Sequence, residues 1–280
     1  MSMTHSDETR EDWQAVGDAA LEKQYCLWAI PAAMCLAALF NISGLGHALQ
    51  RIFLSMPVHE LGHAVTAWFC GFSAIPTVWK TLIPESRGFV APLILAAVIG
   101  HQLFRGWQAN HMPAVWLCAA LLLIQALCTF VMKEDTAQKW ITFGGDGMGM
   151  VLAVLLIGSF HAGKNTQLYK GSLRWGFLVI GAAAFADIFG TWWRARRDPE
   201  SIPFGAQDGI ESDTVKLVDN WGWSHHELVT RYFTLGLVCL LAIGLVYAWG
   251  LWRVNREIAT RQQAARREEW ERRRKSSSPA

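Results

Sequence analysis

Long apolar runs recur along almost the whole chain, and they constrain its fold more than any other feature. A helix of about 20 apolar residues is long enough to cross the hydrocarbon core of a bilayer. Runs close to this length cover residues 25–49, 52–72, 88–104, 113–132, 139–160, 173–193 and 230–252. The links between them are short, so the sequence predicts an all-α polytopic membrane protein with six or seven transmembrane helices. The run at 88–104 is short and contains Pro92, so whether it spans is left open.

Composition agrees with a membrane protein. Of the 280 residues, 52% are hydrophobic and only 17% are charged, whereas soluble domains usually carry about 25% charged residues. We therefore expect the lipid bilayer, and no nucleic acid, among its partners. The six cysteines lie in or beside the apolar runs without a CxxC pair, which is typical of small buried hydrophobes rather than of thiolate metal sites.

The two ends of the chain differ in charge. Residues 1–24 are polar and acidic and lack the basic start and cleavage site of a signal peptide. Residues 253–280 are basic, which favours a cytoplasmic C-terminal tail beside anionic headgroups of a cell (inner) membrane. Between them, residues 25–252 form the expected transmembrane domain. Three arginines follow one apolar run, Arg194, Arg196 and Arg197, and the basic tail follows the next run. If each run crosses the membrane once, these two basic segments cannot both lie on the cytoplasmic side.

One apolar run contains three costly polar side chains. The segment HELGH places His59, Glu60 and His63 inside the run at 52–72. Residues four apart lie on one face of a helix, so His59 and His63 can present their imidazoles to the same point. Glu60 can then reach a water bound there, which is how an HExxH sequence provides two zinc ligands and a general base. A charge at the bilayer centre costs at least about 2.5–3.5 kcal/mol, so chance placement there is selected against.

A catalytic zinc ion typically has three protein ligands. A third ligand within or near a membrane span is expected, and the apolar runs offer two acids. Asp146 is flanked by Gly144, Gly145, Gly147 and Gly149, which would let a helix, a substrate backbone or the metal come close. Asp187 lies deep in the following run. We favour Asp146 as the ligand, with Asp187 as an alternative ligand, a carboxylate supporting one, or an acid paired with another donor.

These two motifs resemble those of the site-2 protease family of intramembrane zinc metalloproteases, over a core of about residues 52–160. The resemblance rests on HELGH in an apolar run and on the Asp-Gly at Asp146, some eighty residues later. It implies that His59, His63 and Asp146 hold one zinc ion per chain and that Glu60 is the catalytic acid and base. It also implies that the chain hydrolyses peptide bonds of transmembrane protein substrates.

Two features depart from the family pattern. Gly144-Gly145 stands where family members often have Asn-Pro. Two apolar runs lie between HELGH and Asp146, so either the run at 88–104 does not cross the membrane or the two ligand helices are antiparallel. The short links leave no room for an inserted PDZ domain, so we expect the membrane-embedded parts of the chain to select the substrate. The β-prone segment 74–88 is either an extended edge that pairs with an unwound substrate or an ordinary interfacial loop.

Other classes of protein remain open. A membrane di-iron oxygenase or desaturase also has an HxxxH box, but it needs further histidine clusters, for which only His225 and His226 are available. A second type of membrane HExxH protease uses a glutamate ligand, for which Glu134 and Glu227 are poor fits. The third class is a non-enzymatic scaffold or transporter. The sequence leaves the substrate and the oligomeric state undetermined.

Several other polar residues have simpler interpretations. Ser224 and Glu227 have the spacing of a capping box at the start of an apolar run, so we expect a helix cap rather than a second metal site. Four further histidines lie near the ends of runs without paired spacing, and we expect them to be polar residues at helix ends: His47, His101, His111 and His161.

Overall fold

The structure, a computed structural model, describes residues 5–207 and 210–276. Within these ranges the chain is almost entirely helical, with two very short antiparallel sheets, β1–β2 and β3–β4. The α-helices are α1 His5–Ile42, α2 Gly44–Gln50, α3 Met56–Phe69, α4 Val90–Gln108, α5 Met112–Phe130, α6 Glu134–Gly158, α7 Gln167–Lys170, α8 Leu173–Ala195, α9 Asp213–Asp219 and α10 His225–Ser276. The other elements are the π-helix η1 Arg51–Ser55, the 3-10 helices η2 Ser159–His161 and η3 Pro199–Ser201, and the strands β1 Ile75–Pro76, β2 Thr81–Leu82, β3 Ala206–Gln207 and β4 Ile210–Glu211.

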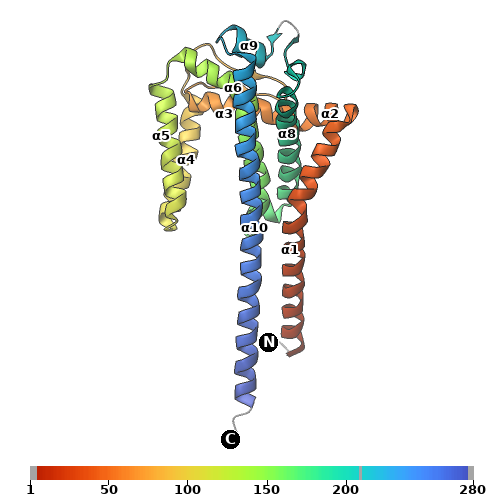
Figure 1. The fold of residues 1–280 in the computed structure, drawn as a ribbon. Helices are drawn as coiled ribbons and strands as arrows, with labels where there is room; N and C mark the ends of the chain where they lie inside the picture. Colours follow the sequence, from red (N-terminus) through yellow and green to blue (C-terminus); the bar gives the residue numbers. More distant parts are fainter. Residues whose placement is uncertain (1–4, 208–209, 277–280) are drawn as a thin grey trace.

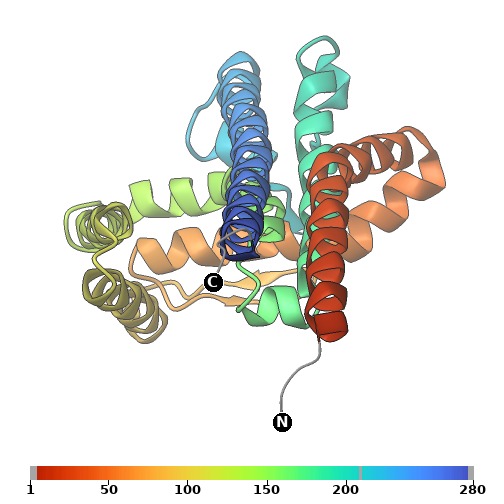
Figure 2. The same cartoon turned by 90° about the horizontal axis from the view of Figure 1, so that it is seen from below.

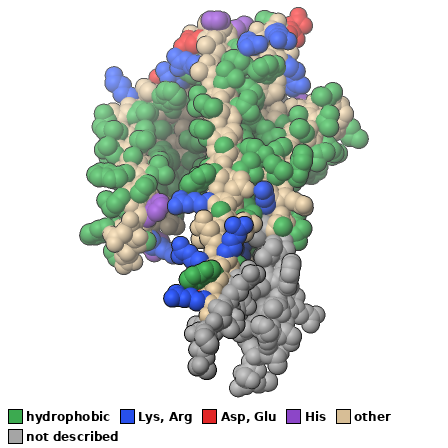
Figure 3. Space-filling view, turned by 60° about the horizontal axis from the view of Figure 1, so that its bottom comes forward, with side chains coloured by type: hydrophobic (Ala, Val, Ile, Leu, Met, Phe, Trp, Pro, Cys, Tyr) green, Lys and Arg blue, Asp and Glu red, His purple; other side chains and the backbone are tan. Residues whose placement is uncertain are grey.

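Six helical segments of the described chain are long and apolar enough to span a membrane: Ala20–Ile42, Val90–Gln108, Met112–Phe130, Glu134–His161, Leu173–Ala195 and His225–Glu268. The expected all-α architecture of a multi-pass membrane protein is confirmed at this level. The doubtful run at 88–104 belongs to one of these helices, α4, which pairs with α5 in a hairpin beside the rest of the bundle (Figure 1). Hydrophobic side chains cover much of the visible face, and charged side chains gather towards its ends (Figure 3).

The apolar run at 52–72 does not form one of these long helices. It begins in the π-helix η1 and continues as α3, which has 14 residues and is therefore about 21 Å long at 1.5 Å per residue. With the five residues of η1 the helical stretch approaches the roughly 30 Å of a bilayer core, so its direction, more than its length, sets it apart from the long helices. Helix α3 ends at Phe69, and Gly71 then adopts a φ of 87°, which favours glycine and turns the chain. In Figures 1 and 2, α3 lies across the direction of the long helices.

Helix α6 is central to the fold and packs against α3, α8 and α10. Its contact with α3 is very close: a Cβ on Gly62 would lie 2.5 Å from the carbonyl oxygen of Gly144 and 2.7 Å from that of Gly145. Gly62 therefore lets the two backbones approach, as small residues do at helix interfaces in membranes. On the α6 side, a Cβ on Gly144 would lie 2.3 Å from Oγ1 of Thr66. This approach brings α6 alongside the HELGH segment.

At the opposite end of the bundle, a partly buried ion pair joins α1 to α8. Arg174 donates to both carboxylate oxygens of Glu22, at 2.7 and 3.1 Å, and its guanidinium lies over the ring of Tyr169. Both chain ends lie at this end, whereas α8 runs towards the end that carries α9 (Figure 1). The arginines at the end of α8 and the basic tail are thus at opposite ends of the bundle, as expected if each apolar run crosses the membrane once.

Candidate metal centre

Two histidines of α3 face each other across one helical turn. His59 and His63 are both buried, with exposed fractions of 9% and 6%. Their rings are nearly perpendicular, and their Nε2 atoms are 3.1 Å apart. The i, i+4 spacing expected to bring the imidazoles together therefore does so.

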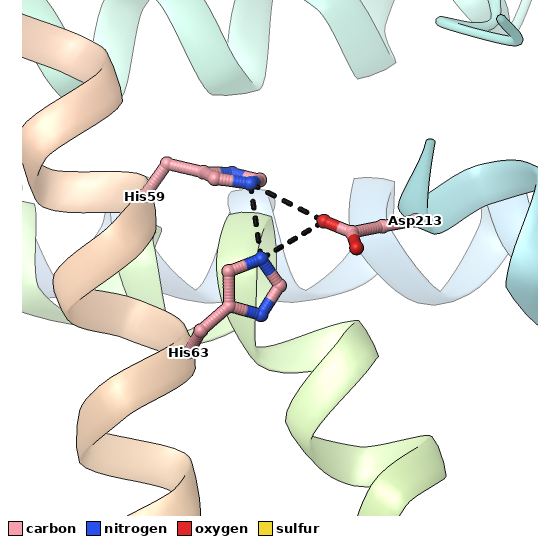
Figure 4. A group of neighbouring side chains, drawn as sticks. All are labelled: His59, His63 and Asp213. Carbon is pink, nitrogen blue, oxygen red and sulfur yellow. Dashed lines mark hydrogen bonds and ion pairs between the residues drawn. The ribbon is translucent and has the colours of Figure 1, made fainter. Parts of the chain in front are cut away.

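A carboxylate from a distant segment completes this group. Asp213 is the first residue of α9, which Ser212 caps by accepting a hydrogen bond from the backbone N–H of Val215. Its Oδ2 lies 3.2 Å from Nε2 of His59 and 2.9 Å from Nε2 of His63 (Figure 4). Burial acts to raise the pKa of Asp213, but hydrogen bonds and positive charge from the two imidazoles in their protonated form outweigh it and hold that pKa well below its usual range.

The other nitrogen of each imidazole is already used. Nδ1–H of His63 donates to the backbone carbonyl of Ile141 at 2.7 Å, and Nδ1–H of His59 donates to Oδ1 of Asp146 at 2.8 Å. Both acceptors belong to α6. Because a carbonyl oxygen only accepts, Nδ1 of His63 carries a proton, so in the neutral ring the Nε2 lone pair is directed at His59 and Asp213. Metal-binding histidines are usually oriented in this way.

Asp146 is itself held in place by two donors. Its Oδ2 accepts a 2.7 Å hydrogen bond from the indole N–H of Trp192, a fully buried residue of α8. Trp192 stacks on Tyr232 of α10, with ring centroids 4.1 Å apart. The orientation of His59 therefore depends on three further helices: α6, α8 and α10.

Glycine is needed beneath the imidazoles. A Cβ on Gly145 would lie 2.5 Å from Cε1 of His59 and 2.5 Å from Nε2 of His63. A side chain there would enter the space between the two rings. The prediction that the glycines around Asp146 permit a close approach is consistent with this packing.

The three facing atoms fit a tetrahedral metal ion. Zinc binds histidine nitrogen and carboxylate oxygen at about 2.0–2.2 Å, which places tetrahedral ligand atoms roughly 3.3–3.6 Å apart, slightly farther than the three atoms lie here. The three separations among His59 Nε2, His63 Nε2 and Asp213 Oδ2 are 3.1, 3.2 and 2.9 Å. Among the described residues these three are the group of histidine, cysteine and acidic side chains that could hold a metal. Two imidazoles and one carboxylate are also a typical ligand set of catalytic zinc.

Glu60 is buried next to the two histidines but makes different contacts. Its Oε2 accepts a 2.8 Å hydrogen bond from the hydroxyl of Thr81, and the same hydroxyl lies 2.7 Å from the backbone carbonyl oxygen of Glu60. Thr81 begins β2, so the hairpin that follows α3 folds back onto the HELGH helix. Glu60 is thus held without belonging to the three-residue group.

A cavity of about 1000 Å³ joins these groups. It is lined by the two histidines and the glutamate of HELGH, by Asp213 and neighbouring residues of α9, by Thr81 and adjacent residues of the β1–β2 hairpin, and by Arg51 of η1. A volume of this size lies at the upper end of the range of small-molecule sites and leaves room for a peptide segment beside the histidines.

The acids singled out from the sequence lie in two different places. Asp146 contacts Nδ1 of His59, the nitrogen that does not face His63, and the structure brings Asp213 rather than Asp146 to the two Nε2 atoms. Asp187 is fully buried and binds Nε2 of His47 at 2.9 Å and Nη1 of Arg51 at 3.0 Å. The donors with which Asp187 pairs are therefore His47 and Arg51, in agreement with the third interpretation of this acid, an acid paired with another donor.

The other polar residues singled out from the sequence differ in their positions. His111 stands just before α5 and His161 ends η2, whereas His101 lies inside α4, so the expectation of a helix-end position is wrong for His101. The backbone N–H of Glu227 donates to Oγ of Ser224 at 3.1 Å at the start of α10, which agrees with a cap. His161 is buried beside Cys26, with its Nδ1 3.9 Å from the sulfur. All six cysteines are free, and three of them are buried.

Comparison with known proteins adds no assignment. No family model matches the chain, no curated protein matches its sequence, and no solved structure matches its fold.

Proposed function

We propose that this chain is a zinc-dependent endopeptidase that hydrolyses peptide bonds of membrane-spanning proteins. One observation supports this most strongly: the Nε2 atoms of His59 and His63 converge with the Asp213 carboxylate while both Nδ1 atoms donate to α6. Both Nε2 atoms face the same carboxylate oxygen, as ligands of one ion would. In this proposal His59, His63 and Asp213 hold one zinc ion, and Asp146 orients His59 instead of binding the metal.

Zinc held by these three groups would supply a Lewis acid that lowers the pKa of water to about 7. The chain itself supplies the proton transfers. Glu60 takes the proton of the attacking water and later gives it to the leaving amide nitrogen. The hydroxyl of Thr81, which donates to Oε2 of Glu60 at 2.8 Å, fixes the direction of this carboxylate.

Peptide bonds of a membrane-spanning helix are hidden in backbone hydrogen bonds, so a substrate must unwind before it is cut. The β1–β2 hairpin is suited to holding the unwound segment. Each strand has a single partner in its sheet, so each has one outer edge, and Trp79, Thr81 and Ile83 line the cavity beside Glu60. Strand addition to such an edge is a common mode of peptide recognition. This favours the extended-edge interpretation of residues 74–88.

The membrane setting gives the site an orientation. If the basic tail lies in the cytoplasm at a cell (inner) membrane, the metal centre lies in the half of the bundle nearer α9, away from the tail (Figure 1). Substrates would then be cut nearer the opposite surface. The short α3 would be enclosed by its neighbours and would not cross the bilayer alone.

A di-iron enzyme is the less favoured alternative. Such a centre needs a second group of ligands, and the described residues contain one group, His59, His63 and Asp213. His225 and His226 lie in the first turn of α10, where Ser224 caps the helix. A non-enzymatic scaffold or transporter does not require the Glu60 carboxylate beside the group formed by His59, His63 and Asp213.

The proposal is tested by cleavage in liposomes. The purified protein should cut a single-span test peptide within its apolar segment, because the cavity and Glu60 are available to an unwound strand. A zinc chelator should abolish cleavage, and added zinc should restore it. Cleavage that persists after all metal is removed, or that returns only with iron, would contradict a zinc hydrolase.

A further inference from the structure

Arg51 lies at the edge of the candidate metal centre without a role in holding the metal. It begins the π-helix η1, which leads directly into α3, and π-helical turns are frequent at functional sites. Its side chain lines the same cavity as His59 and His63. The negative charges of Asp146 and Asp213, as well as that of Asp187, stabilise its guanidinium.

A buried acid holds one side of this guanidinium. Nη1 of Arg51 donates to Oδ2 of Asp187 at 3.0 Å, while the other oxygen of Asp187 binds His47. The Asp187 side chain is completely buried, whereas that of Arg51 is 32% exposed. Asp187 therefore fixes the arginine from behind and leaves its other face accessible.

Most donors of Arg51 are free to bind a ligand. A guanidinium has five N–H groups in a planar fork. Within the described part of the chain, the one hydrogen bond of the Arg51 side chain is the one to Asp187. Lys216 also lines the cavity, but it is 3.9 Å from Oδ1 of Asp213, so its charge is directed at the metal group.

The reaction proposed above creates a need for such a cation. When water adds to a peptide carbonyl carbon, negative charge moves to the carbonyl oxygen. Asp213 and Glu60 already place two carboxylates around this position, and unscreened charges of the same sign repel strongly in a site with little water. A donor fixed in advance near the carbonyl oxygen removes much of this cost.

We propose that Arg51 is a further catalytic residue, which donates hydrogen bonds to the carbonyl oxygen of the scissile peptide as that oxygen becomes negative. Asp187 is a positioning residue that acts through Arg51. The inference rests on the proposed hydrolase function and extends it, since it assigns the group that stabilises the developing charge.

The first test compares the kinetics of Arg51→Gln with those of Arg194→Gln. Arg194 is an exposed arginine near the end of α8 and is not among the residues that line the cavity. Loss of one oxyanion donor typically lowers kcat by about 10²–10³-fold. We expect that loss in Arg51→Gln, with KM and zinc content nearly unchanged, and no loss in Arg194→Gln. Arg51→Lys, which keeps the charge and the bond to Asp187, should recover part of the rate, and Asp187→Asn should show a smaller loss of kcat.

The second test does not depend on turnover. In a Glu60→Gln background, affinity is measured for the test peptide and for the same peptide carrying a phosphonate at the cleaved bond. Arg51→Gln should weaken phosphonate binding by about the factor lost in kcat, and it should leave binding of the unmodified peptide unchanged. Equal weakening of both would show that Arg51 only shapes the cavity.

The possible failures are distinguishable. Loss of zinc in both Arg51→Gln and Arg51→Lys would make Arg51 a structural residue and would overturn the inference alone. If the wild-type protein holds no zinc and cuts no peptide, the proposed function fails, and the role of Arg51 fails with it.

Discussion

Replacing Glu60 by Gln should abolish most peptide cleavage while leaving the metal in place. Glutamine is nearly isosteric, and its carbonyl oxygen can still accept the hydrogen bond that Thr81 donates to Glu60. It cannot accept a proton from water. General-base catalysis contributes about 10²–10⁴-fold, so cleavage of the single-span test peptide in liposomes should fall by at least that factor.

Two further measurements separate this effect from misfolding. Zinc content should be unchanged, because Glu60 is not one of the three side chains that face the metal position. The variant should also retain uncut peptide, which would co-purify with it. The matched control is Glu200→Gln, at an exposed residue in η3, which should cleave normally. Normal cleavage by Glu60→Gln would mean that HELGH is not a hydrolytic site, and loss of zinc and fold would favour the scaffold alternative.

The second large effect is expected at the third ligand. Asp213→Asn removes the carboxylate that faces both Nε2 atoms at 3.2 and 2.9 Å. Asp146→Asn removes only a support of His59, and loss of such a support typically lowers metal affinity by about 10–100-fold. Competition with a chromogenic chelator should therefore rank zinc affinity as wild type, then Asp146→Asn, then Asp213→Asn.

Asp187→Asn provides the control for this ranking, because Asp187 binds His47 and Arg51 and is not in the metal group. It should bind zinc like the wild type. If Asp146→Asn loses zinc while Asp213→Asn keeps it, Asp146 is the ligand, as the family resemblance implies. If Asp187→Asn alone loses zinc, neither assignment holds.

The sequence predicted the all-α membrane architecture and the facing histidines because both depend on local periodicity. Hydropathy alone could not show that the run at 52–72 is not one spanning helix. The apolar residues continue through Cys70 and Phe72, whereas the helix ends at Phe69 and the chain turns at Gly71. The positive φ of Gly71 turns the chain after α3, and the conformation of one residue does not change the hydropathy of the sequence.

Asp213 could not be found from the sequence. It lies 150 residues after His63 and outside the apolar runs, whereas the third ligand of an intramembrane site is expected within or near a span. Its one local signal is Ser212, which caps a helix of seven residues. A cap shows where a helix begins but does not show which distant side chain its first residue meets.

Asp146 was recognised through its glycines, and their packing explains why. Gly145 lies directly against the imidazoles, so the expected close approach of α6 is confirmed. Which nitrogen of His59 its carboxylate meets depends on the packing of α8, through Trp192, and that contact spans 46 residues. Distances between helices decide such details, and a single sequence does not provide them.

The most direct measurement is the metal content of the purified protein, with the ligands identified by X-ray absorption at the zinc edge. We expect one zinc ion per chain, bound by two imidazole nitrogens and a carboxylate oxygen at about 2.0–2.2 Å. The double variant His59→Ala with His63→Ala should bind none. Zinc content that is unchanged in the double variant would contradict the proposed metal centre.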